Sequence, residues 1–146
     1  YAATLALLAA LAATSPAAHA QQGPLPTVRL EASIHLIDAE VARTEQQRET
    51  GLMMRDTMPP NHGMLFVFDE PHVQCFWMKN TLLPLTIAFL ADDGTIVTLA
   101  DMQPQTETNH CSGKPVRYAL EMNQGWFAKR GLKVGFRLSG LPKPTN

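Results

Sequence analysis

The stretch that most constrains the fold runs from Gly63 to Asn80, with the sequence GMLFVFDEPHVQCFWMKN. It contains two apolar runs, Met64–Phe68 and Cys75–Met78, which are separated by the polar segment Asp69–His72. Short apolar runs rich in aromatic and β-branched residues are typical of strands that are stable only when most of their surface is buried. The rest of the chain must therefore supply a sheet and a core around these two runs.

Length and charge limit the classes of protein that this chain can belong to. Its 146 residues are enough for one domain, and 45% apolar with 17% charged residues is ordinary for a globular protein with a real core. The formal net charge is −1, and the longest basic run is Lys129-Arg130. This composition argues against nucleic acid and against anionic membranes as partners.

The first twenty residues have the pattern of a secretory signal, with the apolar run Leu5–Ala13 before the small-residue cleavage site Ala18-His19-Ala20. We expect cleavage after Ala20, and we expect the sequence to begin inside the signal, because a charged n-region and an initiator Met are missing. An uncleaved anchor is the alternative, but the apolar run is shorter than the ~20 residues of a membrane span, and Ser15-Pro16 interrupts it. No other segment reads as a span, so the mature protein is expected in the periplasm or outside the cell.

Alternation of apolar and polar residues predicts about eight short strands in one domain over residues 27–140. A flexible lead-in at residues 21–26 precedes this domain, and a tail at residues 141–146 follows it. Gln103–Pro115 is the only long segment without a pattern. The expected strands are two within Val28–Ala42, the two central runs, Leu82–Leu90, Thr95–Met102, Val116–Met122 and Gly135–Gly140.

Two short helices are expected between these strands. Thr44-Glu45-Gln46-Gln47 fits a capping box, which predicts a helix over Glu45–Met53, with Gly51 close to a neighbouring strand. Trp126–Arg130 is expected to be the second helix, with Gly131 as its C-cap. Since no βαβ alternation is recognisable, we predict an α+β, mostly β fold: a small curled antiparallel sheet or barrel with two short helices.

Five motifs follow one another along the chain: GLMMR (Gly51–Arg55), GMLFVF (Gly63–Phe68), FWMKNTLLPL (Phe76–Leu85), YALEMNQG (Tyr118–Gly125) and GLKVG (Gly131–Gly135). In this order and spacing, from Thr27 to Ser139, the chain resembles the bacterial and archaeal proteins grouped as domain-of-unknown-function family 192. The resemblance implies a compact, mostly β domain that is often exported, and it implies no activity. Many relatives carry an acidic residue where this chain has Thr86, so no role for that carboxylate can be transferred.

Cys75 and Cys111 are the only cysteines, and the predicted export would place them in an oxidising compartment. A pair there is most often a disulfide, which would tie Gln103–Pro115 to the central strand and contribute about 3–4 kcal/mol. The alternative is a Zn²⁺ or Cu(I) site made by His72, Cys75, His110 and Cys111. The disulfide is favoured because adjacent His110 and Cys111 are awkward for chelating one ion, and no cofactor is expected.

A small polar site is predicted from Arg55, Trp77, Lys79, Asn80 and Glu121. Glu121 lies mid-strand among apolar residues, where a carboxylate is costly to bury unless a cation or several donors reach it. Arg55 and Lys79 have the right charge, and Trp77 could form a wall. Two cations around one carboxylate would suit a small anionic ligand. The alternative is a set of unrelated surface charges or structural ion pairs.

Motifs of common hydrolases are missing, since the sequence has neither Gly-x-Ser-x-Gly nor His-Glu-x-x-His. A carboxylate pair of Glu121 and Asp101 is conceivable for glycoside chemistry. The lack of a nucleophile with its base favours a non-catalytic periplasmic binding or accessory domain of unidentified partner. A small hydrolase-like or redox enzyme, or a Zn- or Cu-binding protein, is the alternative.

Overall fold

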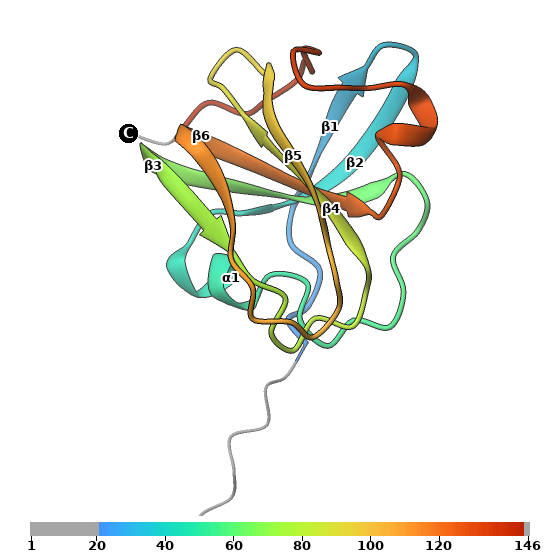
Figure 1. Ribbon diagram of the computed structural model, residues 1–146, viewed down its shortest axis with the longest axis vertical. Helices are drawn as coiled ribbons and strands as arrows, with labels where there is room; N and C mark the ends of the chain where they lie inside the picture. Colours follow the sequence, from blue (N-terminus) through green and yellow to red (C-terminus); the bar gives the residue numbers. More distant parts are fainter. Residues whose placement is uncertain (1–20, 145–146) are drawn as a thin grey trace, which may run out of the picture.

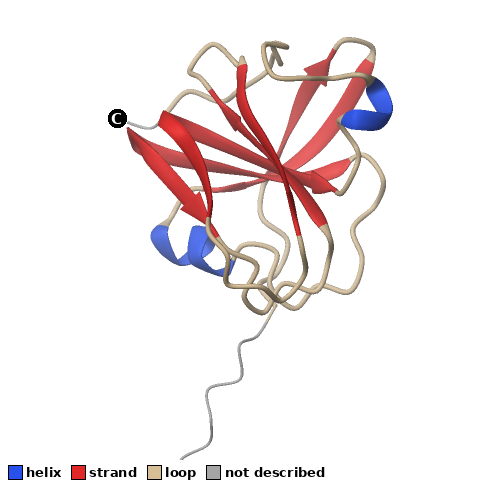
Figure 2. Cartoon of the chain, in the orientation of Figure 1, coloured by secondary structure: helices blue, strands red, loops and turns tan. Residues whose placement is uncertain are grey.

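The computed structural model describes residues 21–144, so the predicted signal segment at residues 1–20 lies outside the described residues. Within the described part the chain is mostly β, as predicted, and forms one six-stranded sheet in the order β1-β2-β3-β6-β4-β5 (Figures 1 and 2). None of the described helices is long and apolar enough to cross a membrane. The elements are β1 (Thr27–Ala32), β2 (His35–Ala42), α1 (Glu45–Thr50), β3 (His62–Phe76), β4 (Leu85–Leu90), β5 (Ile96–Met102), β6 (His110–Asn123) and the 3-10 turn η1 (Ala128–Arg130).

The sheet is mixed, and the predicted wholly antiparallel sheet is wrong at one crossover. β2 and β3 run parallel, with Ala39 opposite Gly63, whereas the other described strand pairs are antiparallel. The connection from Arg43 to Asn61 carries α1 and returns the chain to the end of the sheet where β2 began. Parallel strands need a crossover of about a dozen residues or more, and this connection is long enough. Its helix has six residues, too few to show a helical period in the sequence.

The predicted barrel is also corrected, because the sheet does not close. The segment Gly135–Gly140, expected to be the last strand, is extended but makes only isolated bridges, from Ser139 to Glu31 of β1 and from Arg137 to Thr95 beside β5. The amides of Ser139 and Glu31 each donate to the other's carbonyl at 3.0 Å. This segment therefore touches both edge strands and shields part of their free backbone groups without completing a ladder.

The helix α1 begins as predicted and ends early. The Gln47 amide donates to the Thr44 hydroxyl, and the Thr44 amide donates to the Gln47 side chain, both at 3.1 Å, which forms the capping box. The helix stops at Thr50 because Gly51 takes φ 48°. A Cβ at Gly51 would lie 3.4 Å from the Phe66 ring of β3, which is the close approach expected from the sequence.

Three other boundaries differ from the predictions. The first central apolar run and the start of the second, up to Phe76, belong to one long strand, β3, with register shifts between Val67 and His72 and between Val73 and Cys75. β6 starts at His110, so only the first part of the predicted irregular segment lacks a ladder. The expected second helix is only the 3-10 turn η1, which leaves one α-helix in the described part.

Each face of the sheet packs a separate core. On the covered face, residues such as Leu65, Ala88 and Leu120 pack under Trp126 and Phe127 of the C-terminal segment. The opposite face we call the pocket face, because it carries the hollow described below. Its core is made by the alternate residues of the same strands and by three residues from connections: Met64, Phe66, Ile87, Phe89 and Ala119, covered by Leu52, Met78 and Leu83.

Candidate functional site

Two carboxylates share one row across the pocket face. The strand register places Glu40 beside Met64, Met64 beside Glu121, and Glu121 beside Ile87. A single strand, β3, therefore separates Glu40 from Glu121. Two strand spacings put their Cα atoms roughly 10 Å apart.

Glu40 is fully satisfied within the fold. Arg55 Nη1 and Nη2 donate to its two carboxylate oxygens at 2.5 and 2.9 Å, and the Leu25 amide donates to Oε2 at 3.0 Å. Burial alone would raise the pKa of Glu40, but the hydrogen bonds from Arg55 and Leu25 hold this pKa below its usual value. The carboxylate that Arg55 contacts is thus Glu40, and no contact with Glu121 is present in the described chain.

Residues 77–80 lie at the turn after β3. The Lys79 ammonium lies 3.8 Å from Glu107 Oε1 and 5.2 Å from the centroid of the Trp77 ring, which is 47% exposed. Asn80 takes φ 55°, and its carbonyl accepts the Met54 amide at 2.9 Å. The structure therefore joins Trp77 with Lys79 and brings Asn80 to the segment after α1, but it links neither cation to Glu121.

Glu121 is buried without a partner. Its side chain is 5% exposed, and none of the described residues forms a hydrogen bond or salt bridge with its carboxyl group. Burial raises the pKa of Glu121 to about 8, so the group is mostly protonated at neutral pH. A carboxyl group held neutral in this way can donate a hydrogen bond, or release its proton when a cation arrives.

Glu121 lines a pocket of about 470 Å³, which we call the Glu121 pocket. This volume is within the range of small-molecule sites. Phe76 organises one wall, with its ring centroid 4.9 Å from that of Phe66 and 6.2 Å from that of Phe68, both edge to face. The lining residues come from α1 and the segment after it (Glu45, Arg48, Glu49, Thr50, Gly51, Leu52, Met53), from β3 (Phe66, Phe68, Gln74, Cys75, Phe76), and from Trp77, Thr81, Asn109 and Glu121.

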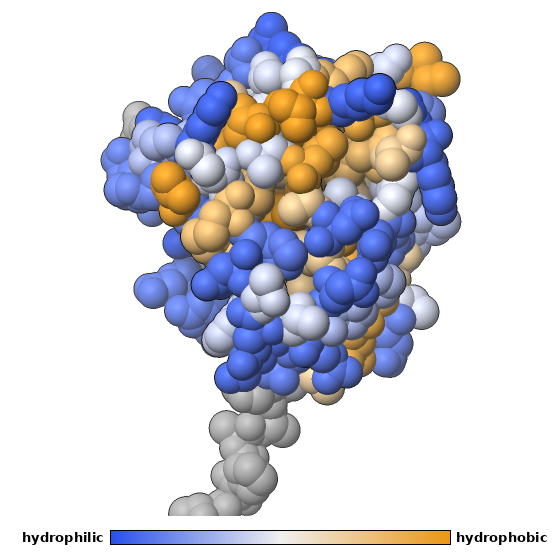
Figure 3. All heavy atoms as spheres, in the orientation of Figure 1, coloured by the Kyte–Doolittle hydropathy of each residue, from blue (hydrophilic) through white to orange (hydrophobic). Residues whose placement is uncertain are grey.

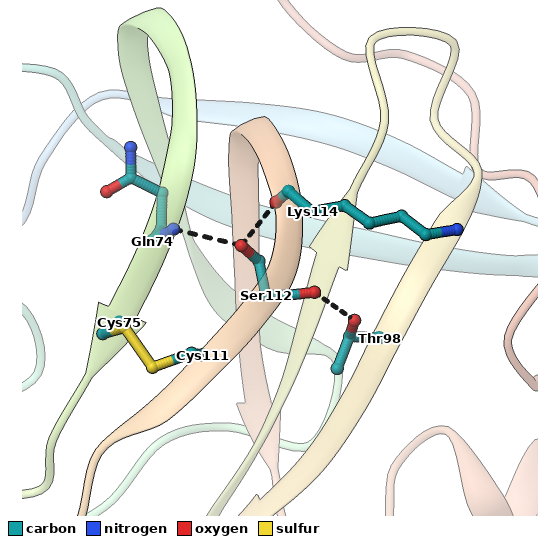
Figure 4. Close-up of a disulfide and its surroundings, with 6 residues drawn as sticks. All are labelled: Gln74, Cys75, Thr98, Cys111, Ser112 and Lys114. Carbon is teal, nitrogen blue, oxygen red and sulfur yellow. Dashed lines mark hydrogen bonds between the residues drawn. A yellow bond between two sulfur atoms is a disulfide. The ribbon is translucent and has the colours of Figure 1, made fainter.

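The predicted disulfide between Cys75 and Cys111 is present and forms part of the pocket's outer wall (Figure 4). The two residues are directly opposite each other on β3 and β6, with Cα atoms 4.0 Å apart, and both are exposed. The alternative metal site with His72 and His110 is not formed, because its two sulfurs are bonded to each other. Among the described residues, no group of three or more His, Cys, Asp or Glu side chains could hold an ion.

Ser112 fixes the two strands next to the disulfide, where the β3–β6 register shifts. Its hydroxyl accepts the Gln74 amide at 3.0 Å and donates to the Lys114 carbonyl at 2.6 Å. The Thr98 hydroxyl of β5 donates to the Ser112 carbonyl at 2.6 Å, as Figure 4 shows. These bonds replace the missing ladder bonds, so the wall that carries Cys75 is held by β5 and β6 together.

The imagined pair of Glu121 and Asp101 is wrong, because the two residues lie on opposite faces of the sheet. Asp101 is directly opposite Thr86, and Glu121 is opposite the next residue, Ile87. The Thr86 hydroxyl donates to Asp101 Oδ1 at 2.6 Å and accepts the Gly125 amide at 3.0 Å. Thr86 thus anchors the start of the C-terminal segment.

A second hollow, of about 380 Å³, lies on this covered face between β5 and the C-terminal segment. Figure 3 shows hydrophobic residues gathered over the upper centre of the molecule, where β5 lies. The polar side chains that line this second hollow include Thr86 and Asp101, which are already hydrogen-bonded to each other. The second hollow therefore has no unpaired carboxyl group comparable to Glu121.

Comparison with known proteins gives the family. The model of domain-of-unknown-function family 192, described as "Uncharacterized ACR", matches residues 27–140. The chain belongs to this family. No curated protein matches the chain.

Two solved structures are similar over most of the chain. A protein from Sinorhizobium meliloti 1021, named as a candidate transcription regulator, is 42% identical, with a TM-score of 0.76 over 82% of this chain and 97% of that one. A protein of unknown function from Novosphingobium aromaticivorans DSM 12444 is 32% identical, with a TM-score of 0.74 over 87% of this chain and 94% of that one. The fold is therefore shared with these two proteins.

Sequence analysis missed two parts of the site. It did not identify Glu40 as the partner of Arg55, although Glu40 also alternates with apolar residues in its strand. It also missed the pocket residues of α1, among them Arg48, because the crossover that carries them over the sheet was not recognised. The four aromatic and three acidic residues that line the pocket were all visible in the sequence as isolated features, but Glu45 and Glu49 reach the pocket only through the crossover between β2 and β3.

Proposed function

We propose that this protein is an exported binding domain, without catalysis of its own, that holds a small molecule in the Glu121 pocket. The observation that carries this proposal is Glu121 itself, a 5% exposed carboxyl group that lines a hollow and has no partner in the described chain. A buried polar group left unsatisfied costs free energy, and a ligand that bonds to it removes that cost. Structural carboxylates are satisfied within the fold, as Glu40 is.

The composition of the pocket supports binding over catalysis. Its described lining contains neither Ser nor His, and the hydroxyl of Thr81 already donates to the Lys79 carbonyl at 3.3 Å. A hydrolase that forms a covalent intermediate would need a nucleophile within hydrogen-bond reach of a base. Glu121 has no such neighbour.

Export is supported by the signal pattern in residues 1–20 and by the exposed disulfide, since disulfides persist mainly in oxidising compartments. We place the protein in the periplasm or outside the cell. Protein from the envelope fraction of the native host should have the intact mass of a chain that begins at Gln21. A mass that retains the first twenty residues would instead favour an anchored protein.

A small anionic ligand is the second candidate, and it was expected from the charges of Arg55 and Lys79. Each of these cations contacts a carboxylate, Glu40 and Glu107 respectively, so an anion would have to displace that carboxylate. The Sinorhizobium protein is named as a candidate transcription regulator, but in this chain a net charge of −1 without a long basic run supports no nucleic-acid partner.

A redox enzyme is the third candidate, because the exposed Cys75 lines the pocket. In such an enzyme a dithiol substrate would be oxidised to a disulfide while Cys75 and Cys111 accept its two electrons and two protons. Catalytic disulfides have reduction potentials above about −270 mV, whereas structural ones lie below about −300 mV. We expect a measured potential in the structural range, and a value near −200 mV would favour the enzyme.

Amide chemical-shift mapping with a library of small aromatic and aliphatic compounds tests the binding proposal. Shifts should cluster at Gly51, Gln74 and Trp77 around the pocket. Gln74→Trp should fill the Glu121 pocket and abolish these shifts, whereas the matched variant Val134→Trp fills the second hollow and should leave them unchanged. Shifts that survive Gln74→Trp and vanish in Val134→Trp would move the binding site to the covered face.

A further inference from the structure

The ligand class can be narrowed from the chemistry of the Glu121 pocket, and this step rests on the proposed function. We propose that the pocket binds an organic ammonium group carried on an apolar body, with Glu121 as its counter-ion at the floor and aromatic rings as its walls. Three features of the pocket support this assignment: the aromatic rings, the excess of carboxyl groups over basic groups, and the unpartnered buried acid among them.

The aromatic faces are already suited to cations. Two of the four rings at the pocket each hold a cation of the protein, with the Arg48 guanidinium 4.9 Å from the centroid of Phe68 and the Lys79 ammonium 5.2 Å from that of Trp77. Phe66 and Phe76 line the same hollow without such a contact among the described residues. Aromatic rings gathered around a hollow are the usual means of binding alkylated ammonium ions.

Charge favours a cation over an anion. Three carboxyl groups, Glu45, Glu49 and Glu121, line the pocket, and Arg48 is its one basic lining residue in the described chain. The Arg48 guanidinium donates to the backbone carbonyls of Arg43 and, at 3.1 Å, of Val67. It therefore has less capacity to bind an incoming anion, while an incoming cation meets carboxyl groups at both the rim and the floor.

Glu121 supplies the partner that an ammonium group needs away from water. Its direct neighbours across the strands are apolar Met64 and Ile87, so nothing on β3 or β4 neutralises its charge. The charged groups nearest to it on other elements are Glu45, Arg48 and Glu49 of α1, which line the same pocket, and Glu40 of β2, which lies on the same row and is paired with Arg55. A cation that enters would let Glu121 ionise and would form an ion pair with it, to which an ammonium group that carries an N–H would add a charge-assisted hydrogen bond.

This binding mode predicts a measurable dependence of ligand affinity on pH. The free protein holds a proton on Glu121, so a cation binds as the protein releases that proton to the solvent. Affinity for a permanent cation should then rise about tenfold per pH unit below the pKa of Glu121, or about 50-fold from pH 6 to pH 8, and level off above it. A neutral ligand of the same shape should bind with little dependence on pH.

Three probes of one shape test the inference by isothermal titration calorimetry: phenethyltrimethylammonium, 2-phenylethanol and phenylacetate. At pH 8 we expect the ammonium probe to bind at least about tenfold more tightly than the alcohol, and phenylacetate to bind most weakly. Glu121→Gln should abolish the pH-dependent rise and leave the affinity for 2-phenylethanol within about threefold. The matched variant Glu31→Gln, an exposed carboxylate on β1 outside the pocket, should keep the rise.

The outcomes separate this inference from the function on which it rests. If the alcohol or phenylacetate binds as tightly as the ammonium probe, the ammonium assignment is overturned and the binding pocket stands. If none of the three binds at about 10 mM, both fail. A short blocked peptide with one lysine distinguishes the source of the ammonium group. If the peptide binds more tightly than free phenethylamine, the natural ligand is part of a protein chain; if it binds more weakly, the ligand is a free amine. Either result supports an ammonium ligand.

Discussion

Glu40 and Glu121 are two buried acids on one row of the same sheet face, and the fold treats them in opposite ways. Glu40 has two bonds from Arg55 and one from the Leu25 amide, whereas Glu121 has no partner in the described chain. The pKa of Glu40 is held below its usual value by those bonds, and burial raises the pKa of Glu121 to about 8. Glu40 is an ionised, structural carboxylate, whereas Glu121 is held as an uncharged carboxyl group that lines the Glu121 pocket.

The difference arises from the connections above each acid, since Glu40 on β2 and Glu121 on β6 flank the same residue of β3, Met64. The crossover after β2 brings Arg55 over Glu40, while above Glu121 the chain leaves the pocket open between α1 and the curled end of β3. A site of this kind costs stability, because Glu121 gives up the partner that Glu40 has. Variants that change one end of the row while leaving the other intact can test this contrast.

The largest effect should come from the wall at the Glu121 end. The double variant Cys75→Ser, Cys111→Ser removes a cross-link over a sequence separation of 36, which should lower the free energy of unfolding by about 4 kcal/mol on the chain-entropy relation. Urea denaturation measures this loss. Adding Arg55→Ala should cost the same in both backgrounds, because the Glu40 end is held separately; a coupling above about 1 kcal/mol would show that the two ends are one unit.

The next effect is at the Glu40 end. Arg55→Ala leaves Glu40 buried with only the Leu25 amide as donor, and the side chains of the pair are 12% and 17% exposed. A fully buried pair costs about 3–5 kcal/mol to break, so this partly exposed one should cost about 2 kcal/mol in urea denaturation. Lys79→Ala is the matched control, since its partner Glu107 is largely exposed, and it should change stability by less than about 0.5 kcal/mol.

The sequence predicted which residues take part in the two ends of this row better than it predicted which of them contact each other. The apolar residues around Glu121 indicated a carboxyl group that would be costly to bury without a partner, and the two cysteines predicted the disulfide beside the pocket. Which cation meets which acid depends on the parallel register of β2 and β3, and a six-residue helix leaves no periodic signal of that crossover. Arg55 was therefore assigned to the wrong acid on the row.

The edges of the sheet were equally hard to predict. Gly135–Gly140 alternates like a strand, but it crosses between β1 and β5 and makes only isolated bridges, so that an expected barrel is an open sheet. Periodicity reports which side chains are buried, and it does not report how many backbone bonds the segment makes. The family match over residues 27–140, in contrast, followed from motifs that depend on residue identity alone.

The two acids should also give opposite dependences on pH. Glu121 has a folded pKa of about 8 against a usual 4.5, so between about pH 5 and pH 8 the folded protein holds a proton that the unfolded chain has released. Stability from this group is therefore complete below the unfolded pKa and falls by about 1.4 kcal/mol per pH unit as the pH rises to about 8. Glu40 acts in the other direction, because its lowered pKa gives stability above the unfolded pKa that is lost on acidification.

Urea midpoints at pH 6, 7 and 8 isolate the Glu121 contribution. Glu121→Gln cannot ionise, so its midpoint should fall less than that of the wild type over this range, and the difference should grow with pH. Glu49→Gln, at the exposed rim, should follow the wild type. Parallel curves for the wild type and Glu121→Gln would mean that Glu121 is ionised in the folded protein and has a partner.

The smallest effect has the opposite sign from the others and is the sharpest test of the contrast. At pH 6, where Glu121 is neutral, Glu121→Met should raise the free energy of unfolding by about 1 kcal/mol, because an apolar side chain of similar length replaces an unsatisfied polar group beside Met64 and Ile87. Glu40→Met should lower it, because it leaves Arg55 without its partner, and the buried Arg55 Nε already has no hydrogen bond in the described chain. If both variants lose stability to the same degree, both acids belong to the scaffold and the pocket has no reason to hold a ligand. If Glu121→Met is more stable than the wild type and no longer binds the ammonium probe, then the stability that the wild type loses by burying Glu121 without a partner is needed for binding.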